Sequence, residues 1–188
     1  GNEDSDMIDR IGKYLMATKA KFYTCHCTGI EAYKRLKSVM GDNIGIGEMT
    51  GTYLNKYFAI DLQKGEIQVL EFMGDNSTVP QQRQEGYLKT ADKKIKIVQS
   101  FNTNWQRQKA QEQMENFLNT SKPEDIEKIK AVITQDDEIE MGVLDAINAY
   151  KGPAKLDIRL ITGVSGRREN LDTFEKEKID QVTYAFSP

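Results

Sequence analysis

The chain has 188 residues, of which 38% are hydrophobic and 29% are charged, and these proportions are ordinary for a globular protein. Its length suits one domain with a buried core and a small appendage. The 26 Lys and Arg residues are outnumbered by 29 Asp and Glu residues, and the net charge of −3 argues against nucleic acid as a partner. No apolar run is long enough to span a bilayer, so we expect no membrane insertion.

Short runs rich in β-branched and aromatic residues predict buried β-strands. Their apolar character is continuous rather than alternating, which is typical of strands covered on both faces in a parallel sheet. We expect strands at residues 20–26, 66–72, 95–101, 131–134, 157–164 and 181–187.

Segments with apolar residues at helical spacing alternate with these strands. We expect helices around residues 7–15, 30–40, 46–57, 105–118 and 139–147, with shorter ones at 81–90 and 168–178. Asn104 is the expected N-cap of the fourth helix, and Asp136 and Asp137 open the fifth near its positive end. Alternation of this kind predicts right-handed βαβ units. The expected fold class is therefore α/β, in a three-layer Rossmann-like arrangement with a mostly parallel sheet of about six strands.

The residue types that carry catalysis are scarce. His26 is the one histidine, and Cys25, His26 and Cys27 would alternate faces on a strand, so the three cannot all reach one metal ion. No nucleophile elbow, Walker sequence or Rossmann glycine fingerprint occurs, and we interpret the glycines of 45–51 as helix-start and close-packing residues. We therefore expect no catalytic residue, no metal and no cofactor.

Polar and aromatic residues follow three of the predicted strands. Trp105, with the asparagines before it, follows strand 95–101, Asp136 and Asp137 follow strand 131–134, and Ser165 follows strand 157–164. Ligands of open α/β sheets bind beyond the carboxyl ends of the strands. An aromatic face with carboxylates and amides around it suits a polyhydroxylated ligand. Two simpler interpretations stay open: Trp105 as a core residue, and Asp136 and Asp137 as a helix cap.

Ordered motifs between residues 42 and 188 carry a family resemblance. The segment 83–87 (RQEGY) resembles an R-x-x-G-F motif, and 104–107 (NWQR) resembles an aromatic-plus-Arg helix start. The segment 131–142 (AVITQDDEIEMG) is similar to A-V-F-A-Q-N-D-E-M-A-L-G, and 161–166 (ITGVSG) resembles a later strand end. Together they resemble the C-terminal lobe of the ribose-type periplasmic sugar-binding proteins of ABC transporters, which implies a periplasmic-binding-protein type I lobe.

The resemblance implies sugar contacts at Arg83, Trp105, Asp136, Ser165 and Phe186. The family mostly has Asn in place of Asp136, Asp in place of Ser165 and often Gln in place of Phe186, and losing an Asp removes a charged acceptor of two hydroxyls. The resemblance implies a non-catalytic carbohydrate-binding lobe whose partner is a small sugar, with weak or lost binding in this truncated or fused form. An extracytoplasmic location, periplasmic or lipoprotein-anchored, follows if this resemblance governs, and a cytoplasmic one otherwise.

The N-terminal residues resemble a different family. The segment 23–29 (YTCHCTG), within residues 6–40, resembles the C-terminal end of metallo-β-lactamase-fold hydrolases, in which H-C-T-G supplies a metal-binding histidine. The H-x-H-x-D-H motif that completes such a site is missing. We therefore divide the chain into an extension at 1–41 and a binding-protein-like lobe at 42–188, with strand 20–26 expected to join the sheet.

Alternative functions remain open at this point. The chain could be a remnant of a metallo-β-lactamase-fold hydrolase fusion, or an interaction domain that has lost its ligand. It could also be a LacI-type effector lobe, although neither a helix-turn-helix nor a basic patch precedes it. A lobe that exposes surfaces evolved to face a partner also predicts a homo-oligomer.

Overall fold

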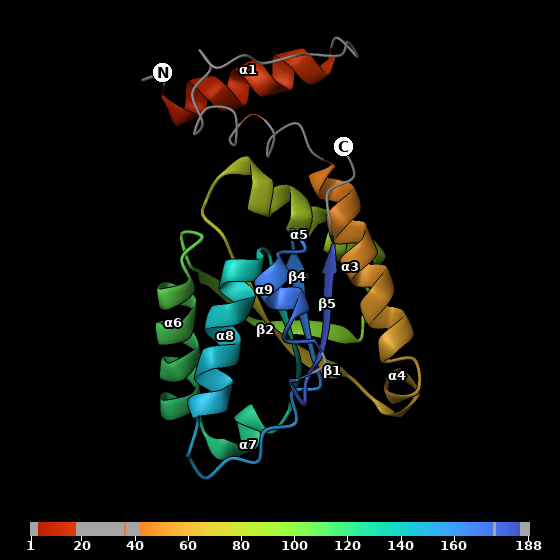
Figure 1. Ribbon diagram of the computed structural model, residues 1–188. Helices are drawn as coiled ribbons and strands as arrows, with labels where there is room; N and C mark the ends of the chain where they lie inside the picture. Colours follow the sequence, from red (N-terminus) through yellow and green to blue (C-terminus); the bar gives the residue numbers. More distant parts are fainter. Residues whose placement is uncertain (1–3, 18–35, 37–41, 175, 185–188) are drawn as a thin grey trace.

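A central parallel sheet organises the computed structural model of the chain, which describes residues 4–17, 36, 42–174 and 176–184 (Figure 1). The strand order in the sheet is β2-β1-β3-β4-β5, and every pair of neighbours is parallel. The strands are β1 Ile67–Met73, β2 Ile95–Asn102, β3 Ile129–Thr134, β4 Leu160–Val164 and β5 Asp180–Tyr184. The α/β class and five of the predicted strands are thus confirmed. The predicted strand at 20–26 lies outside the described residues.

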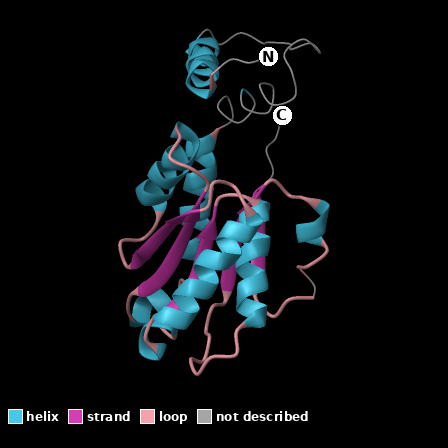
Figure 2. Ribbon diagram, turned by 90° about the vertical axis from the view of Figure 1, so that its left-hand side faces the viewer, coloured by secondary structure: helices cyan, strands magenta, loops and turns pink. Residues whose placement is uncertain are grey.

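Helices cover both faces of the sheet, as Figure 2 shows with the strands in magenta. Helices α3 and α5 pack together on one face, and α6 and α8 pack together on the other. The described helices are α1 Ser5–Ala17, α3 Asn43–Tyr57, α4 Asp61–Lys64, α5 Thr78–Thr90, α6 Arg107–Thr120, α7 Pro123–Ile126, α8 Asp137–Ala149 and α9 Arg168–Leu171. This arrangement confirms the three layers. Of the predicted helix at 30–40, only Leu36 is described, in a helical conformation.

Several predicted helix boundaries were wrong for local reasons. Helix α5 begins three residues before the predicted start because Pro80 falls in its first turn, where a missing N–H costs nothing. Helix α9 ends at Leu171 rather than at 178 because the backbone N–H and the hydroxyl of Thr173 both donate to the carbonyl of Asn170, tightening the chain into turns. The single-turn helices α4 and α7 were not predicted, since four residues carry no periodicity.

The sheet separates two clusters of buried side chains. Leu70 and Phe72 of β1 pack toward α6 and α8, whereas Ile67 and Val69 of the same strand pack toward α3 and α5. Both faces of β1 are therefore buried, and this explains why its sequence is apolar without alternation.

Helices α3 and α5 approach each other so closely that glycine is required at the contact. A Cβ added at Gly47 would overlap the backbone carbonyl of Arg83, and one added at Gly86 would overlap that of Ile44. At the start of α3, the Asp42 carboxylate accepts a hydrogen bond from the Gly45 N–H (2.8 Å) and caps the helix. The predicted helix-start role of Gly45 and packing role of Gly47 are confirmed.

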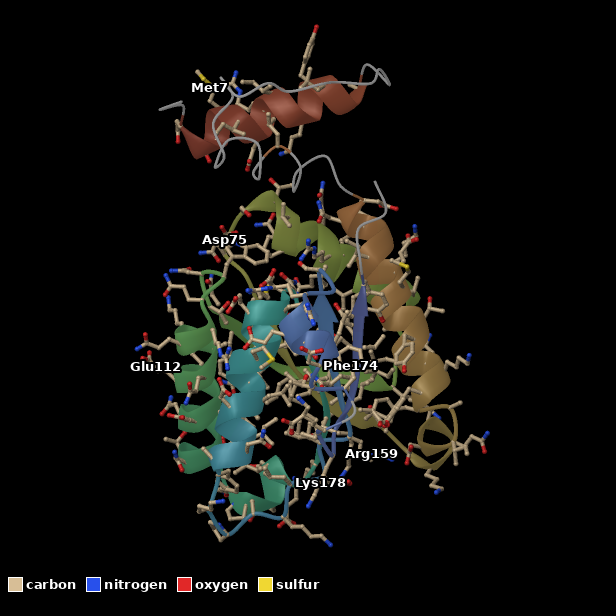
Figure 3. All side chains as sticks on the ribbon, viewed as in Figure 1. Met7, Asp75, Glu112, Arg159, Phe174 and Lys178 are labelled. Atoms are coloured by element: carbon tan, nitrogen blue, oxygen red, sulfur yellow. The ribbon has the colours of Figure 1, made fainter. Side chains whose placement is uncertain are left out.

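Helix α1 lies beyond the sheet edge at which the strands end (Figures 1 and 3). The Lys13 ammonium donates to the Thr78 hydroxyl at the start of α5 (3.2 Å). Met7, Ile11 and Tyr14 are exposed along α1 at helical spacing. In the described part of the chain, no helix combines the length and the hydrophobicity that crossing a membrane requires.

Candidate functional site

The carboxyl ends of the parallel strands meet at one edge of the sheet, the upper edge in Figure 1. Trp105 follows β2, Asp136 follows β3 and Ser165 follows β4, while Arg83 reaches the same edge from α5, the helix that follows β1. Four of the predicted site residues are therefore brought to one edge. The fifth, Phe186, lies outside the described residues.

Arg83 is a fixed, buried cation, with only 6% of its surface exposed. Its Nε donates to the Asn43 Oδ1 (3.1 Å), and its Nη1 donates to the backbone carbonyl of Gln135. Burial lowers the pKa of the guanidinium to about 10, against the opposing effect of Asp136. Arg83 therefore stays protonated at neutral pH, held by α3 and by the loop that carries Asp136.

Asp136 combines a structural role with a position in the site. As the N-cap of α8, its Oδ1 accepts from the Glu138 N–H (2.8 Å), so the helix-cap interpretation is confirmed for Asp136. Burial and then the neighbouring charge of Asp137 raise the pKa of Asp136 to about 6, while Arg83 and Arg167 lower it. The carboxylate is thus mostly ionised at pH 7 and close to titration.

Ser165 adopts an unusual backbone conformation, with φ at 135°, and Gly166 follows at 72°. A non-glycine residue in this region is strained and persists only where its surroundings hold it. The Ser165 side chain is exposed, and its hydroxyl lies close enough to the Asp136 carboxylate to favour the ionised form and lower its pKa. The strained loop thus brings a hydroxyl to the site.

Trp105 lies in the turn between β2 and α6 rather than inside the helix. Asn104 and Trp105 have φ values of 51° and 60°, and the N-cap of α6 is Gln106 in an extended conformation. The prediction of Asn104 as the N-cap was wrong, because a capping residue needs an extended backbone and not a left-handed one.

The Trp105 ring joins the core and the site. It is half-buried, packs against the cluster beneath α6 and α8, and covers Gly74, where an added Cβ would overlap it. The guanidinium carbon of Arg83 lies 5.8 Å from the ring centroid, within cation–π range. The core interpretation therefore holds in part, and the same ring lies within reach of Arg83 in the site.

Sequence reasoning missed three residues that complete this arrangement. Asn43 and Gln135 hold Arg83, and the Arg167 guanidinium pairs with Glu138 beside Asp136. Gln135 lies inside the 131–142 motif of the resemblance and Asn43 stands at the start of the resembling region, and these were the only signals available for them. Nothing in the local sequence indicated Arg167.

The chemistry available at this edge is recognition by stacking and hydrogen bonding. A cation, an aromatic face, a carboxylate and a hydroxyl come from four different loops or helices. Across the described ranges, no three His, Cys, Asp or Glu side chains are placed to hold a metal ion. Cys25, His26 and Cys27 lie outside the described residues.

Comparison with known proteins agrees with this architecture. The family model of the periplasmic binding protein domain matches residues 4–188. The ribose import binding protein RbsB of Bacillus subtilis (strain 168) is 30% identical over 151 residues, which cover 80% of this chain and 44% of that protein. The chain thus spans less than half the length of this curated relative.

Solved structures share the fold at lower identity. A Mycobacterium smegmatis protein superposes with a TM-score of 0.65 at 21% identity, over 78% of this chain and 48% of that one. The fructose binding periplasmic domain of the hybrid two component system BT1754 gives 0.62 at 22% identity, over 78% and 46% of the two chains. The Caulobacter myo-inositol binding protein gives 0.60 at 19% identity, over 74% and 45%.

Proposed function

The chain belongs to the periplasmic binding protein domain family, and we propose that residues 42–188 form a non-catalytic carbohydrate-binding lobe. The observation that carries this proposal is the convergence of Arg83, Trp105, Asp136 and Ser165 at the carboxyl ends of the strands. The relatives reported above are named for ribose import, fructose binding and myo-inositol binding, and all three of those ligands are small polyols or sugars.

Each side chain has a role that follows from its chemistry. Trp105 offers an apolar face on which the C–H face of a sugar ring stacks. Arg83 supplies N–H donors to hydroxyl oxygens, and the Asp136 carboxylate accepts from hydroxyl groups in charge-assisted hydrogen bonds. The Ser165 hydroxyl acts as both donor and acceptor.

We propose binding without chemistry because the described residues place no histidine beside the Ser165 hydroxyl. Ser165 faces the carboxylate of Asp136, and a serine nucleophile is ordinarily activated by a base such as an imidazole. The one histidine in the sequence, His26, belongs to the N-terminal segment. Arg83 and Asp136 therefore serve as hydrogen-bonding partners.

The affinity expected of this chain by itself is low. If a protein with two lobes binds a sugar with a micromolar Kd, the free energy is about −8 kcal/mol, and half of that interaction, about −4 kcal/mol, gives a Kd near millimolar. Ser165 and Phe186, where the resembled family has Asp and often Gln, weaken the interaction further. We propose weak binding on this ground.

We also propose a division of the chain at residues 41 and 42. Helix α3 begins at Asn43 with Asp42 as its cap, and all strands of the described sheet, with the helices that cover them, follow this point. Residues 1–41 are then an extension of the lobe. Membership of a periplasmic family supports an extracytoplasmic location for the protein.

Self-association is a further part of the proposal. The exposed residues Met7, Ile11 and Tyr14 form an apolar stripe on α1, and apolar surface of this kind favours contact with another copy. We expect light scattering to report a dimer at high concentration and Ile11→Asp to remove it. A monomer at all concentrations would contradict this part.

A fluorescence titration tests the ligand. Trp105 is the only tryptophan, so its emission reports on the site without interference. We expect pentoses or hexoses to give a saturable change with a Kd near millimolar, and Asp136→Ala to abolish it. Asp125→Ala, which removes an exposed carboxylate in α7 at the opposite edge of the sheet, is the matched control. No response at about 100 mM sugar would refute sugar binding, and saturation at micromolar sugar would refute its weakness.

A further inference from the structure

Asp137 is a fully buried carboxylate that does not cap the helix it begins. Its Oδ2 accepts from the backbone N–H of Arg167 (2.6 Å), and its Oδ1 accepts from the hydroxyl of Thr183 (2.9 Å). One partner lies in the loop after β4 and the other in strand β5. The side chain therefore ties α8 to two segments far along the chain.

The Thr183 hydroxyl relays this contact to the neighbouring residue. The Thr183 hydroxyl donates its proton to the Asp137 Oδ1. Its lone pairs are then free to accept from the Gly166 N–H, which lies 3.1 Å from the Thr183 Oγ1. Because the Gly166 N–H can only donate, the Thr183 hydroxyl links this loop N–H to the Asp137 carboxyl group.

Three consecutive backbone N–H groups in the loop after β4 each donate a hydrogen bond, two of them to Thr183 and Asp137. The Ser165 N–H donates to the carbonyl of Tyr184 (3.0 Å), Gly166 to Thr183, and Arg167 to Asp137. This is the loop in which Ser165 has a φ of 135°. A strained backbone conformation of this kind persists only where several surrounding contacts hold it in place.

A second buried layer holds Asp137 in place. The Asn170 side-chain amide donates both to the Asp137 backbone carbonyl (3.1 Å) and to the Glu140 Oε2 (2.9 Å), and Gln181 donates to the Glu140 Oε1 (3.0 Å). A Cβ added at Gly163 would overlap Glu140 and lie 2.8 Å from the Asp137 Oδ1. The network therefore fills the space between α8, α9 and β5.

We propose that Asp137, acting through Thr183, is a positioning residue for the ligand site. Asp137 is itself fully buried, and it holds the β4–α9 loop so that the strained Ser165 keeps its hydroxyl near Asp136. The expected effect of Asp137 on sugar affinity rests on the proposed sugar-binding function. The expected effect on the β4–α9 loop does not, because it concerns the protein without sugar.

The test compares hydroxyl and methyl at position 183. Thr183→Val keeps the shape and removes the relay, whereas Thr183→Ser keeps the hydroxyl. Thr90→Val is the matched control, because Thr90 is also half-buried and its hydroxyl donates to a backbone carbonyl (2.9 Å), but at the far end of α5. Asp137→Asn is a second way to disrupt the relay, because the new NH2 group would face the Arg167 N–H or the Thr183 hydroxyl, each of which donates to an Asp137 oxygen in the wild type.

Amide hydrogen exchange in the sugar-free protein separates a local effect on the loop from a loss of overall stability. We expect Thr183→Val to speed exchange at Ser165, Gly166 and Arg167 about tenfold relative to the core strands, consistent with the loss of buried hydrogen bonds. Thr183→Ser should stay close to the wild type, and Thr90→Val should leave these amides unchanged. Equal acceleration across all strands, or none at the loop, would overturn the proposal.

Sugar titration completes the test. If the wild type responds to sugar, we expect Thr183→Val to raise the Kd about fivefold, as the loss of one hydrogen bond implies, and Thr183→Ser to restore it. Unchanged affinity in Thr183→Val would overturn the positioning role. If no sugar binds the wild type, the proposed function and the positioning of a sugar site both fail, and exchange at the loop alone decides whether Asp137 acts as its clamp.

Discussion

The guanidinium carbon of Arg83 lies 5.8 Å from the centre of the Trp105 ring, although the two residues come from different layers of the fold. Arg83 is anchored by Asn43 and Gln135, so the cation cannot follow the ring if the ring moves. A ligand that stacks on Trp105 therefore meets a positive charge in a fixed place. The aromatic face and the cation form one recognition unit.

Removing this cation should act on Asp136 as well as on the ligand. Arg83 lowers the pKa of Asp136, so Arg83→Met should raise that pKa above its present value of about 6. We expect the titration of Asp136, followed by NMR, to shift to higher pH and sugar-induced fluorescence changes to disappear. Arg168→Met, at an exposed position in α9, should change neither. An unshifted Asp136 in Arg83→Met would show that the two charges are uncoupled.

Sugar binding should depend on pH through Asp136. The carboxylate is the charged acceptor of the site and its pKa is about 6, so its charge is lost as the pH falls through 6. We expect affinity to fall between pH 7 and pH 5 in the wild type. The dependence should flatten in Asp136→Asn, in which no proton is gained. A pH-independent wild-type affinity would exclude Asp136 as the acceptor.

Stability should change with pH in the direction set by a buried acid. Burial raises the pKa of Glu140 to about 7 from an ordinary value of 4.5, so between these values the folded state binds more protons than the unfolded state. The free energy of unfolding attributable to Glu140 therefore decreases as the pH rises from 4.5 to 7, by an amount on the order of 2 kcal/mol. We expect chemical denaturation to show this slope in the wild type and a smaller one in Glu140→Gln. The same slope in both would assign it to other groups.

The close approach of α3 and α5 makes a further stability prediction. Gly86→Ala places a methyl group against the backbone carbonyl of Ile44, which cannot move without displacing the helix. We expect a loss of about 1–3 kcal/mol in the free energy of unfolding, typical of overpacking. Gly65→Ala is the matched control, since an added Cβ there meets nothing within 4 Å and its φ of 169° suits any residue. Equal stability of the two variants would contradict the packing argument.

The sheet and the main helices were predictable because their signals are local. Strand β1 is apolar on both faces, and this gives a continuous hydrophobic run that a short window detects. Asp136 signalled the start of α8 in the same way. Glu71 of β1 departs from this pattern: it is a buried carboxylate held by Gln84 and Ser100 (2.7 Å each), and no local pattern identifies these partners.

The supporting residues of the site were harder to predict because their partners are distant in sequence. The network around Asp137 joins α8 to Asn170 and Thr183, and only the folded sheet brings these segments together. Residues of the candidate site itself were found through the resemblance and through their position at strand ends. The residues that hold them in place, such as Asn43, Gln135 and Asp137, were identified in that role only in the structure.

The proximity of the Ser165 hydroxyl to the Asp136 carboxylate leads to a prediction about charge placement. The ribose-type proteins that the chain resembles have Asn and Asp at these two positions, the reverse of the charge order found here. Ser165→Asp alone would set two carboxylates side by side, raise the pKa of one of them and give little gain in affinity. Combining it with Asp136→Asn leaves one carboxylate, moved to the end of β4, with an amide beside it. We expect this double variant to bind ribose more tightly than either single variant in the Trp105 titration. If the double variant binds no better than Ser165→Asp, the placement of the charge does not limit affinity.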